Sequence, residues 1–389
     1  MKARRFLPSR RSPCLLGHGS RSVRVARRRP NFGGYLRRSL GALVAACVAT
    51  ALPIHVAANE LIVFPRVEVL HTQGRADDPE TTEGTAAASI FYAGDWRQLR
   101  ALVEFNLQYD YSNTEIVREK EFERAQLGWR FDPANTVWVG RYHTPLGYWN
   151  TAHHHGAHLQ TSISRPRIHE FEDDGGILPV HFFGLLLQGI QSNHEGALSY
   201  DVGAASGPTL SEGALEPVEV LAPQRWGKPS FVGRLSWRPD AVGESEVGAF
   251  AAQTRIPVLD PIADEVRQTI GGAFANFDFT PWRVVAELFW VRDAFRSTGK
   301  ASDFAVAMIE GEYRVSHMWV LFARHEALGA GARDAYLDRF PDYPKARTVG
   351  GVRWDITHHQ ALTFEVARHA RRDGVVYTQT ALQWSTAFP

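Results

Sequence analysis

The sequence predicts an all-β protein: an antiparallel, up-and-down transmembrane β-barrel of about sixteen strands. The first observation behind this prediction is a two-residue period in segment 99–111. Every odd position there is apolar, and the even positions are polar or charged with one exception. Such a period is typical of a strand with one apolar and one polar face. Tyr109 and Tyr111 end the apolar face, as an aromatic belt does at a membrane surface.

The second observation is that the same pattern recurs to the end of the chain. One apolar row, aromatic at both ends, occupies alternate positions from Trp282 to Trp290, and others occupy 125–131, 352–356 and 362–366. No segment after residue 58 has the length and apolar character of a membrane-spanning helix. In lipid an antiparallel sheet must close, because an open edge leaves backbone groups without partners.

The third observation is that short and long connections alternate. Short connections rich in Pro, Asn, Asp and Gly are predicted near 94–97, 132–135, 192–196, 279–281, 316–317 and 357–360. Longer polar stretches lie between them at 72–84, 111–118, 145–178, 206–229, 256–267 and 328–345. This alternation is typical of an up-and-down barrel with turns at one end and loops at the other.

The first 58 residues are predicted to be a secretory leader. They contain twelve basic residues and no acidic one, and an apolar run at 40–51 is followed by small residues up to Ala58. This order is typical of a signal peptide, so we expect cleavage after Ala58 and a barrel over residues 59–389. A lipoprotein box at 44–47 and a twin-arginine signal at Arg37 and Arg38 are alternative hypotheses for the same segment.

Removing the leader makes the chain acidic and free of cysteine. The full chain has 43 basic and 42 acidic residues, so cleavage leaves 31 and 42, a net charge of about −11. An acidic chain argues against a nucleic-acid partner, which calls for basic patches. Both cysteines, Cys14 and Cys47, lie in the leader, so the mature chain is expected to hold no disulfide and no thiolate metal site.

Two motifs resemble a known family. The C-terminal row Leu382, Trp384 and Phe388 is similar to the C-terminal signal of Gram-negative outer-membrane barrels. Segment 139–147, VGRYHTPLG, resembles the strand-to-loop motif of porins related to the phosphate-selective O/P type. The resemblance covers residues 60 to 388 and implies a passive channel for small hydrophilic solutes, embedded in the lipid of the outer membrane of a Gram-negative bacterium. A homotrimer is implied by the same resemblance alone.

Segment 145–178 is the stretch predicted to carry function. In the porins that this chain resembles, the third external loop folds inward and narrows the channel, and 145–178 is the third long connection. Its histidines come first, then its arginines, then its carboxylates, and opposed charges in a constriction orient dipolar solutes. The predicted constriction residues are Arg141, His153, His154, His155, His158, Arg165, Arg167, Glu170, Glu172, Asp173 and Asp174.

The barrel wall itself is predicted to have a mixed lining, which implies little anion preference. Basic candidates on inward positions are Arg100, Arg124, Arg130, Arg141, Arg283, Arg314, Arg324 and Arg353. Acidic candidates on equivalent positions are Glu104, Glu123, Glu287, Glu310, Glu312 and Asp355.

A transition-metal site in the histidine-rich loop is an alternative hypothesis. Imidazole is the commonest ligand of such metals, and His153 and His155 share one face of an extended segment while His154 and His158 share one face of a helical turn. Zinc or copper held by His153, His155 and His158 would imply metal uptake or sensing. A solvated polar loop without a metal role is the third interpretation of this segment. No other cofactor is expected.

Enzymatic activity is not expected, although a non-conducting enzymatic or structural barrel is kept as a second alternative. Some outer-membrane barrels hydrolyse lipids with wall Ser and His residues, but no nucleophile motif surrounds Ser199 or the pair Ser316 and His317. A structural barrel or adhesin predicts a plugged lumen and no conductance.

Overall fold

The computed structural model describes residues 58–75, 80–112, 116–153, 156–193, 195–211, 213–220, 227–240, 243–259, 263–329 and 334–389. The predicted leader up to residue 57 lies outside this range, as do His154 and His155. Among the described residues, no helix is long and apolar enough to cross a membrane.

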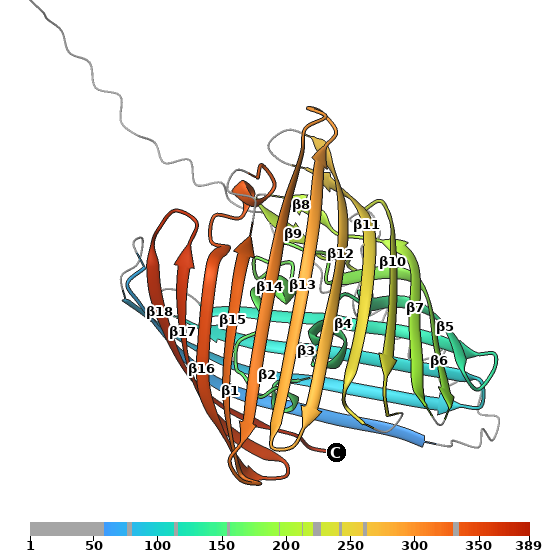
Figure 1. Ribbon diagram of the computed structural model, residues 1–389, viewed down its shortest axis with the longest axis horizontal. Helices are drawn as coiled ribbons and strands as arrows, with labels where there is room; N and C mark the ends of the chain where they lie inside the picture. Colours follow the sequence, from blue (N-terminus) through green and yellow to red (C-terminus); the bar gives the residue numbers. More distant parts are fainter. Residues whose placement is uncertain are drawn as a thin grey trace, which may run out of the picture. The chain divides into compact units, whose positions relative to one another are not determined.

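Sixteen antiparallel strands form a closed barrel (Figure 1). Each strand pairs with the next along the chain, and β1 pairs with β18 to close the ring. The strands are β1 (Ala58–Gln73), β2 (Glu80–Trp96), β3 (Leu99–Tyr111), β4 (Ile116–Arg130), β5 (Asn135–His143), β6 (His181–Asn193), β7 (Gly196–Ser206), β10 (Pro229–Arg238), β11 (Glu246–Val258), β12 (Asp264–Phe279), β13 (Trp282–Phe295), β14 (Ala301–Arg314), β15 (Trp319–Gly329), β16 (Pro344–Thr357), β17 (Gln360–Arg371) and β18 (Val376–Thr386). The predicted fold class and strand number are confirmed.

The connections also follow the predicted alternation. At one end the strands are joined by short turns, such as Arg97 and Gln98 between β2 and β3. At the other end the long connections include 144–180 and 207–228, the second of which contains a hairpin of β8 (Thr209–Ser211) and β9 (Ala214–Glu216). The last residues of the sequence lie near the short turns, where Phe388 forms an antiparallel bridge with Val63 of β1.

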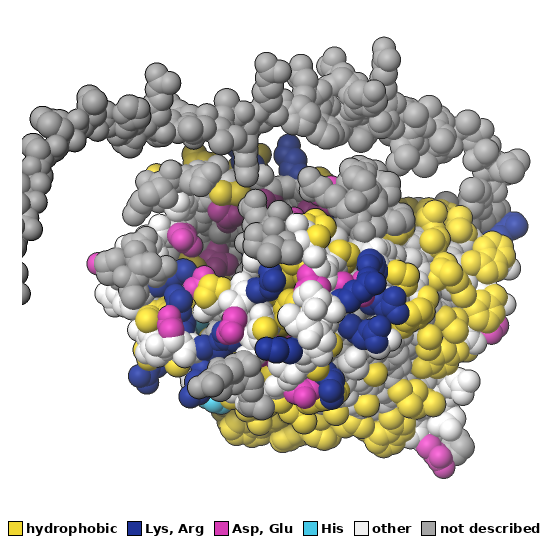
Figure 2. All heavy atoms as spheres, turned by 90° about the horizontal axis from the view of Figure 1, so that it is seen from above, with side chains coloured by type: hydrophobic (Ala, Val, Ile, Leu, Met, Phe, Trp, Pro, Cys, Tyr) yellow, Lys and Arg dark blue, Asp and Glu magenta, His cyan; other side chains and the backbone are white. Residues whose placement is uncertain are grey.

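The outer face of the barrel is apolar. On β13 the two faces separate sharply, because Leu288 is 53% exposed while Glu287 beside it is 3% exposed. Seen end-on in Figure 2, hydrophobic side chains cover much of the outer rim, and charged side chains gather inside it. Aromatic pairs lie at the short-turn end, with Trp282 packed on Tyr313 at 4.4 Å and Trp319 stacked on Trp354 at 5.5 Å between ring centroids. This arrangement matches the apolar band and aromatic girdle of a membrane barrel.

One part of the inner face is apolar as well. Inward side chains of β11 to β14, among them Phe250, Ile270, Val285, Phe289 and Phe304, are at most 4% exposed and belong to one core cluster. In a lumen filled only with water, these side chains would be exposed to solvent. They are buried because another part of the chain packs against them.

Candidate functional site

The connection between β5 and β6, residues 144–180, packs inside the barrel. It contains α2 (Trp149–Ala152) and two single-turn 3-10 helices, η1 (Ala157–Leu159) and η2 (Arg167–His169). Its apolar side chains, which include Leu146, Trp149, Ile168, Ile177 and Leu178, join the same core cluster as the inner face of β11 to β14. The loop therefore covers the apolar part of the wall by hydrophobic contact.

Glu287 on β13 fixes the start of the loop. Its carboxylate accepts hydrogen bonds from the backbone N–H of Tyr148 at 2.7 Å and of Trp149 at 2.6 Å, and its other oxygen lies 2.5 Å from Nε2 of His169. The side chain is fully buried, so these donors replace the water that its charge loses. Gly147 is required beside it, since a Cβ would lie 2.7 Å from the carboxylate and the φ of +72° is in the left-handed region.

Charged residues of β16 and β17 fix the middle of the loop. Glu365 accepts hydrogen bonds from the backbone N–H groups of Ile163 at 2.8 Å and Ser164 at 3.2 Å. Arg353 donates from Nη1 to the carbonyl oxygen of His158 at 2.8 Å. Wall side chains of opposite sign thus satisfy both donors and acceptors of a backbone segment that has no sheet partner.

Arg324 on β15 is the centre of a third contact. Its fully buried guanidinium lies 2.7 Å from Glu310 and 2.9 Å from Glu326, and it donates to the carbonyl oxygen of Ser164 at 2.8 Å. Glu326 in turn accepts from the backbone N–H of Arg167 at 2.6 Å. Arg347, 3.6 Å from Glu326, supplies the second positive charge, so two carboxylates and two guanidinium groups balance where water is excluded.

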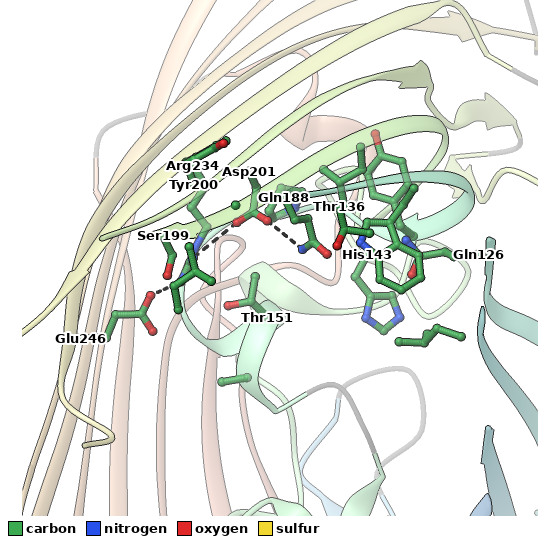
Figure 3. A pocket seen from close by; sticks show the side chains of 18 of the residues that line it. Gln126, Thr136, His143, Thr151, Gln188, Ser199, Tyr200, Asp201, Arg234 and Glu246 are labelled. Atoms are coloured by element: carbon green, nitrogen blue, oxygen red, sulfur yellow. Dashed lines mark hydrogen bonds and ion pairs between the residues drawn. The ribbon is translucent and has the colours of Figure 1, made fainter. Parts of the chain in front are cut away.

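A polar cavity of about 610 Å³ lies beside the loop, between residues 145–152 and the inner faces of β3 to β7, β10 and β11 (Figure 3). Its arginines on β3 and β4 are Arg100, Arg124 and Arg130; its carboxylates on β7, on β11 and in the turn before β11 are Asp201, Glu244 and Glu246. Arg234 joins the acidic group, with its guanidinium 2.7 Å from Glu246 and 3.5 Å from Asp201. The three arginines are ion-paired as well, Arg100 and Arg130 with Asp95 and Arg124 with Glu104, so the charges on both sides of the cavity are mixed.

The predicted constriction histidines have separate surroundings. Nε2 of His153 lies 3.0 Å from the guanidinium of Arg283. His158 lies 3.3 Å from the carbonyl oxygen of His358, and burial together with the nearby Arg353 lowers the pKa of its imidazole. His154 and His155 lie outside the described residues, as noted above. Each of the two described rings thus faces a different cationic wall residue.

The predicted arginines and the first of the predicted carboxylates form local pairs rather than two facing clusters. The guanidinium of Arg165 lies 3.7 Å from the centroid of the Phe171 ring, and that of Arg167 lies 2.7 Å from the Glu170 carboxylate. These contacts stabilise the conformation of the loop. They engage charged groups that were expected to face each other across the lumen.

Two further predicted residues pair with the barrel wall. Arg141, on β5, is 2% exposed and lies 2.5 Å from the carboxylate of Glu121 on β4. Glu172 is fully buried and accepts hydrogen bonds at 2.8 Å from both the backbone N–H and Nδ1 of His181, the first residue of β6.

Asp173 and Asp174 are the predicted carboxylates that remain exposed to the lumen. With Glu104, Glu119, Glu121 and Glu123 they line a narrow space of about 90 Å³, which also meets the cations Arg66 and Arg165. Enclosure by the barrel, helped by the negative charges of Glu170 and Asp173, raises the pKa of Asp174 to about 8. This part of the lumen is acidic, and the Asp174 carboxyl changes its charge near pH 8.

Sequence patterns placed Glu287, Arg324 and Arg353 on the inner wall but did not show that they hold the loop. Glu287 was predicted to face the lumen, but the pattern gave no sign that it accepts hydrogen bonds from the loop. Glu326 and Glu365 were not among the candidate site residues. Their signal was present, because each is an isolated acidic residue at an inward position of an otherwise alternating strand.

A closed sixteen-strand barrel with an apolar outer face, an aromatic belt and a polar lumen is an outer-membrane β-barrel with porin architecture. Solved structures share this architecture. An anion-selective porin from Comamonas acidovorans aligns with a TM-score of 0.60 at 14% identity, covering 85% of this chain and 99% of that one. The outer-membrane channel DcaP of Acinetobacter baumannii aligns with a TM-score of 0.55 at 11% identity, covering 85% and 97%.

A trimer form of OmpT, an outer-membrane protein of Vibrio cholerae, aligns with a TM-score of 0.52 at 8% identity, covering 85% and 100%. No model of a known protein family matches the sequence, and no curated protein matches it. At these identities the likeness shows the fold. The location predicted from the sequence, the outer membrane of a Gram-negative bacterium, agrees with that fold.

Proposed function

We propose that the protein is a passive outer-membrane channel for small hydrophilic solutes, with the loop 145–178 forming its constriction. The observation that carries this proposal is the asymmetry of the lumen. The loop packs on the apolar wall of β11 to β14 and is fixed there by Glu287, Glu365 and Arg324, while the cavity of about 610 Å³ stays open beside it. Buried hydrogen bonds and apolar packing give the constriction a defined position.

The cavity favours dipolar solutes over simple anions. Ion pairs line both sides, with Arg100, Arg124 and Arg130 on one side and Arg234 between Asp201 and Glu246 on the other, so a solute that carries both signs of charge meets partners of both signs. A phosphate-selective channel calls for basic groups all round, and the mixed lining argues against that finer resemblance. Anion selectivity of the kind named for the Comamonas acidovorans porin is disfavoured for the same reason.

The test is conductance with a matched pair of variants on β7. Ser199 lines the cavity, and its neighbour Leu198 points to the membrane, where it is 40% exposed. We expect Ser199→Trp to lower the single-channel conductance in a planar bilayer, because the indole fills the passage, and Leu198→Trp to leave it unchanged. Equal conductance of both variants and wild type would place the passage elsewhere. A silent wild-type barrel that is folded by heat-modifiability on gels would overturn the channel and favour a structural or enzymatic barrel.

Two further proposals concern a metal ion in the histidine-rich loop and the oligomeric state. Zinc or copper held by His153, His155 and His158 is disfavoured, because the two described rings contact separate parts of the wall, His153 at Arg283 and His158 at the carbonyl oxygen of His358. A homotrimer rests on the resemblance and on the trimer form of the Vibrio cholerae protein. Chemical cross-linking in mild detergent would reveal the trimer as a band of three times the monomer mass.

A further inference from the structure

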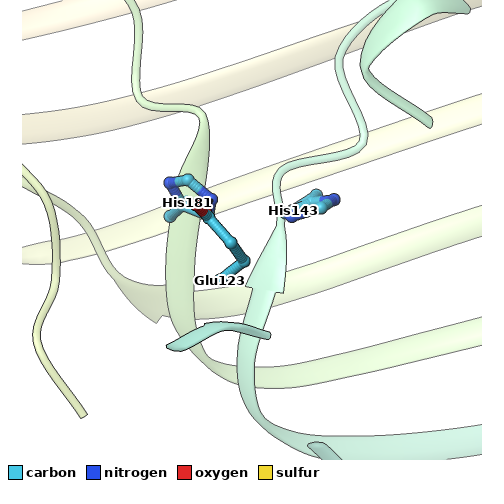
Figure 4. Close-up of side chains that lie close together, drawn as sticks. All are labelled: Glu123, His143 and His181. Carbon is cyan, nitrogen blue, oxygen red and sulfur yellow. Dashed lines mark ion pairs between the residues drawn. The ribbon is translucent and has the colours of Figure 1, made fainter. Parts of the chain in front are cut away.

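Three neighbouring strands bring Glu123, His143 and His181 to one level of the inner wall (Figure 4). His143 is the last residue of β5 and His181 is the first of β6, and the two are directly paired across these strands. Strands β4 and β5 are antiparallel, and Ala125 on β4 pairs with Arg141 on β5. Two residues back on β4 and two residues forward on β5, Glu123 lies level with His143. One ligand atom from each of the three side chains lies within 4.8 Å of the other two.

Glu123 reaches this position through an irregularity of β4. The pairing of β4 with β3 shifts between Phe122 and Arg124, so Glu123 is an extra residue there, a β-bulge. As a result Glu123 and Arg124 are both buried, although consecutive strand residues normally point to opposite faces. Bulges re-aim a side chain and occur often beside functional sites.

Glu172 orients the His181 ring from the loop side. It accepts from Nδ1 at 2.8 Å, which leaves Nε2 directed at the Glu123 carboxylate, 3.0 Å away. A carboxylate that binds the far nitrogen of a ligating histidine is the usual support of a metal-bound imidazole. The parallel ring of Phe171, 5.7 Å from His181 between centroids, fixes the ring plane as well.

We propose that Glu123, His143 and His181 bind a divalent transition-metal ion of the zinc type, with Glu172 as the supporting carboxylate. Two imidazoles and one carboxylate are a ligand set that suits zinc and leaves a position for water. The acidic space of about 90 Å³ opens onto Glu123 and offers a path along which a cation gains charge stabilisation. The nearby guanidinium of Arg141 is balanced by Glu121, at 2.5 Å.

The position of this site gives the metal a role. His143 immediately precedes the loop 144–180, and His181 immediately follows it. A bound ion joins both ends of the loop to β4 and, through Glu172, to the loop itself. The metal ion therefore cross-links the two ends of the loop to β4. Binding of the metal at this site does not depend on whether the barrel conducts.

The experiment is a zinc titration of the refolded mature barrel in detergent micelles, in competition with a chromophoric zinc indicator. We expect wild type to bind one zinc ion, and Glu123→Gln and His143→Ala to abolish that binding. Glu172→Gln should weaken it about 10- to 100-fold, as expected for a supporting residue. His317→Ala, in the exposed turn between β14 and β15, is the control and should bind as wild type does.

A triple variant distinguishes the proposed site from the alternative metal site in the histidine-rich loop. Replacing His153, His155 and His158 by alanine should leave zinc affinity unchanged, and loss of binding in this variant would overturn the assignment. Cobalt absorption provides a readout on wild type that needs no variant, because a four-coordinate site gives intense visible bands. A folded wild-type barrel that binds neither zinc nor cobalt would show that His181 serves only as an ion-pair partner of Glu123 and Glu172.

Discussion

Glu287 offers the sharpest test of the proposal that the loop narrows the pore. Glu287→Ala removes three hydrogen bonds to a buried carboxylate, from the backbone of Tyr148 and Trp149 and from the ring of His169. Hydrogen bonds to a charged group contribute about 1.5–3 kcal/mol each, so the three together contribute roughly 4.5–9 kcal/mol. Burial of Leu146, Tyr148 and Trp149, which flank this contact, contributes about 1.5–3 kcal/mol for each side chain, a similar sum. Losing the hydrogen bonds removes about half of what holds the segment around α2, so this segment should spend part of its time away from the wall.

Glu287→Gln is the matched control. Its amide oxygen still accepts from both backbone N–H groups, and its NH₂ group faces Nε2 of His169, which accepts in the other tautomer. The variant keeps the shape and the hydrogen bonds of the contact and removes only the charge. We therefore expect its pore to stay close to that of wild type.

Single-channel conductance and liposome swelling with sugars of increasing size measure the outcome. Glu287→Ala should conduct more and admit larger sugars than wild type, and Glu287→Gln should not. If Glu287→Ala forms a heat-modifiable barrel with wild-type conductance and size limit, the contact at Glu287 does not position the constriction.

Three further outcomes are expected. Asp174→Asn should remove a rise in cation selectivity that wild type shows as pH increases through about 8, where the Asp174 carboxyl loses its proton, and an unchanged reversal-potential profile would contradict this. Arg324→Leu should lower the stability of the barrel by about 3–5 kcal/mol, because buried Glu310 loses its ion-pair partner and Glu326 keeps only the more distant Arg347, and an unshifted urea midpoint would refute it. Mass spectrometry of the secreted chain should show a mature N-terminus directly after Ala58; a lipid-modified Cys47 would favour the lipoprotein alternative.

Local patterns were sufficient to predict the barrel. A strand that faces lipid on one side and the lumen on the other must alternate apolar and polar residues, so a segment such as 99–111 can be identified as a strand from its own residues. Connection lengths then separate the two ends, since short turns and long loops differ in composition. These signals involve neighbouring residues only, which is why strand number and topology follow from the chain itself.

The interior of the barrel could not be predicted in the same way, because its contacts join residues far apart in sequence. Tyr148 and Glu287 are separated by 139 positions, and no period relates them. Val285 and Phe289 break the expected polar inner row of β13, since the loop rather than water covers them. The bulge at Glu123 is fixed by pairing with β3, and its one local sign is that the outward apolar positions change from even, at Phe122, to odd, at Leu127 and Trp129.

The off-centre position of the loop divides the inner wall by the kind of change it tolerates. Inward positions of β11 to β14 are part of a packed core, so substitutions there alter volume and affect assembly of the loop and barrel together. Inward positions that line the cavity, such as Ser199 on β7, are not part of that core. In the proposed channel, solute preference can therefore change on this side of the wall, in evolution or in a redesigned nanopore, while the packed side keeps the loop in place.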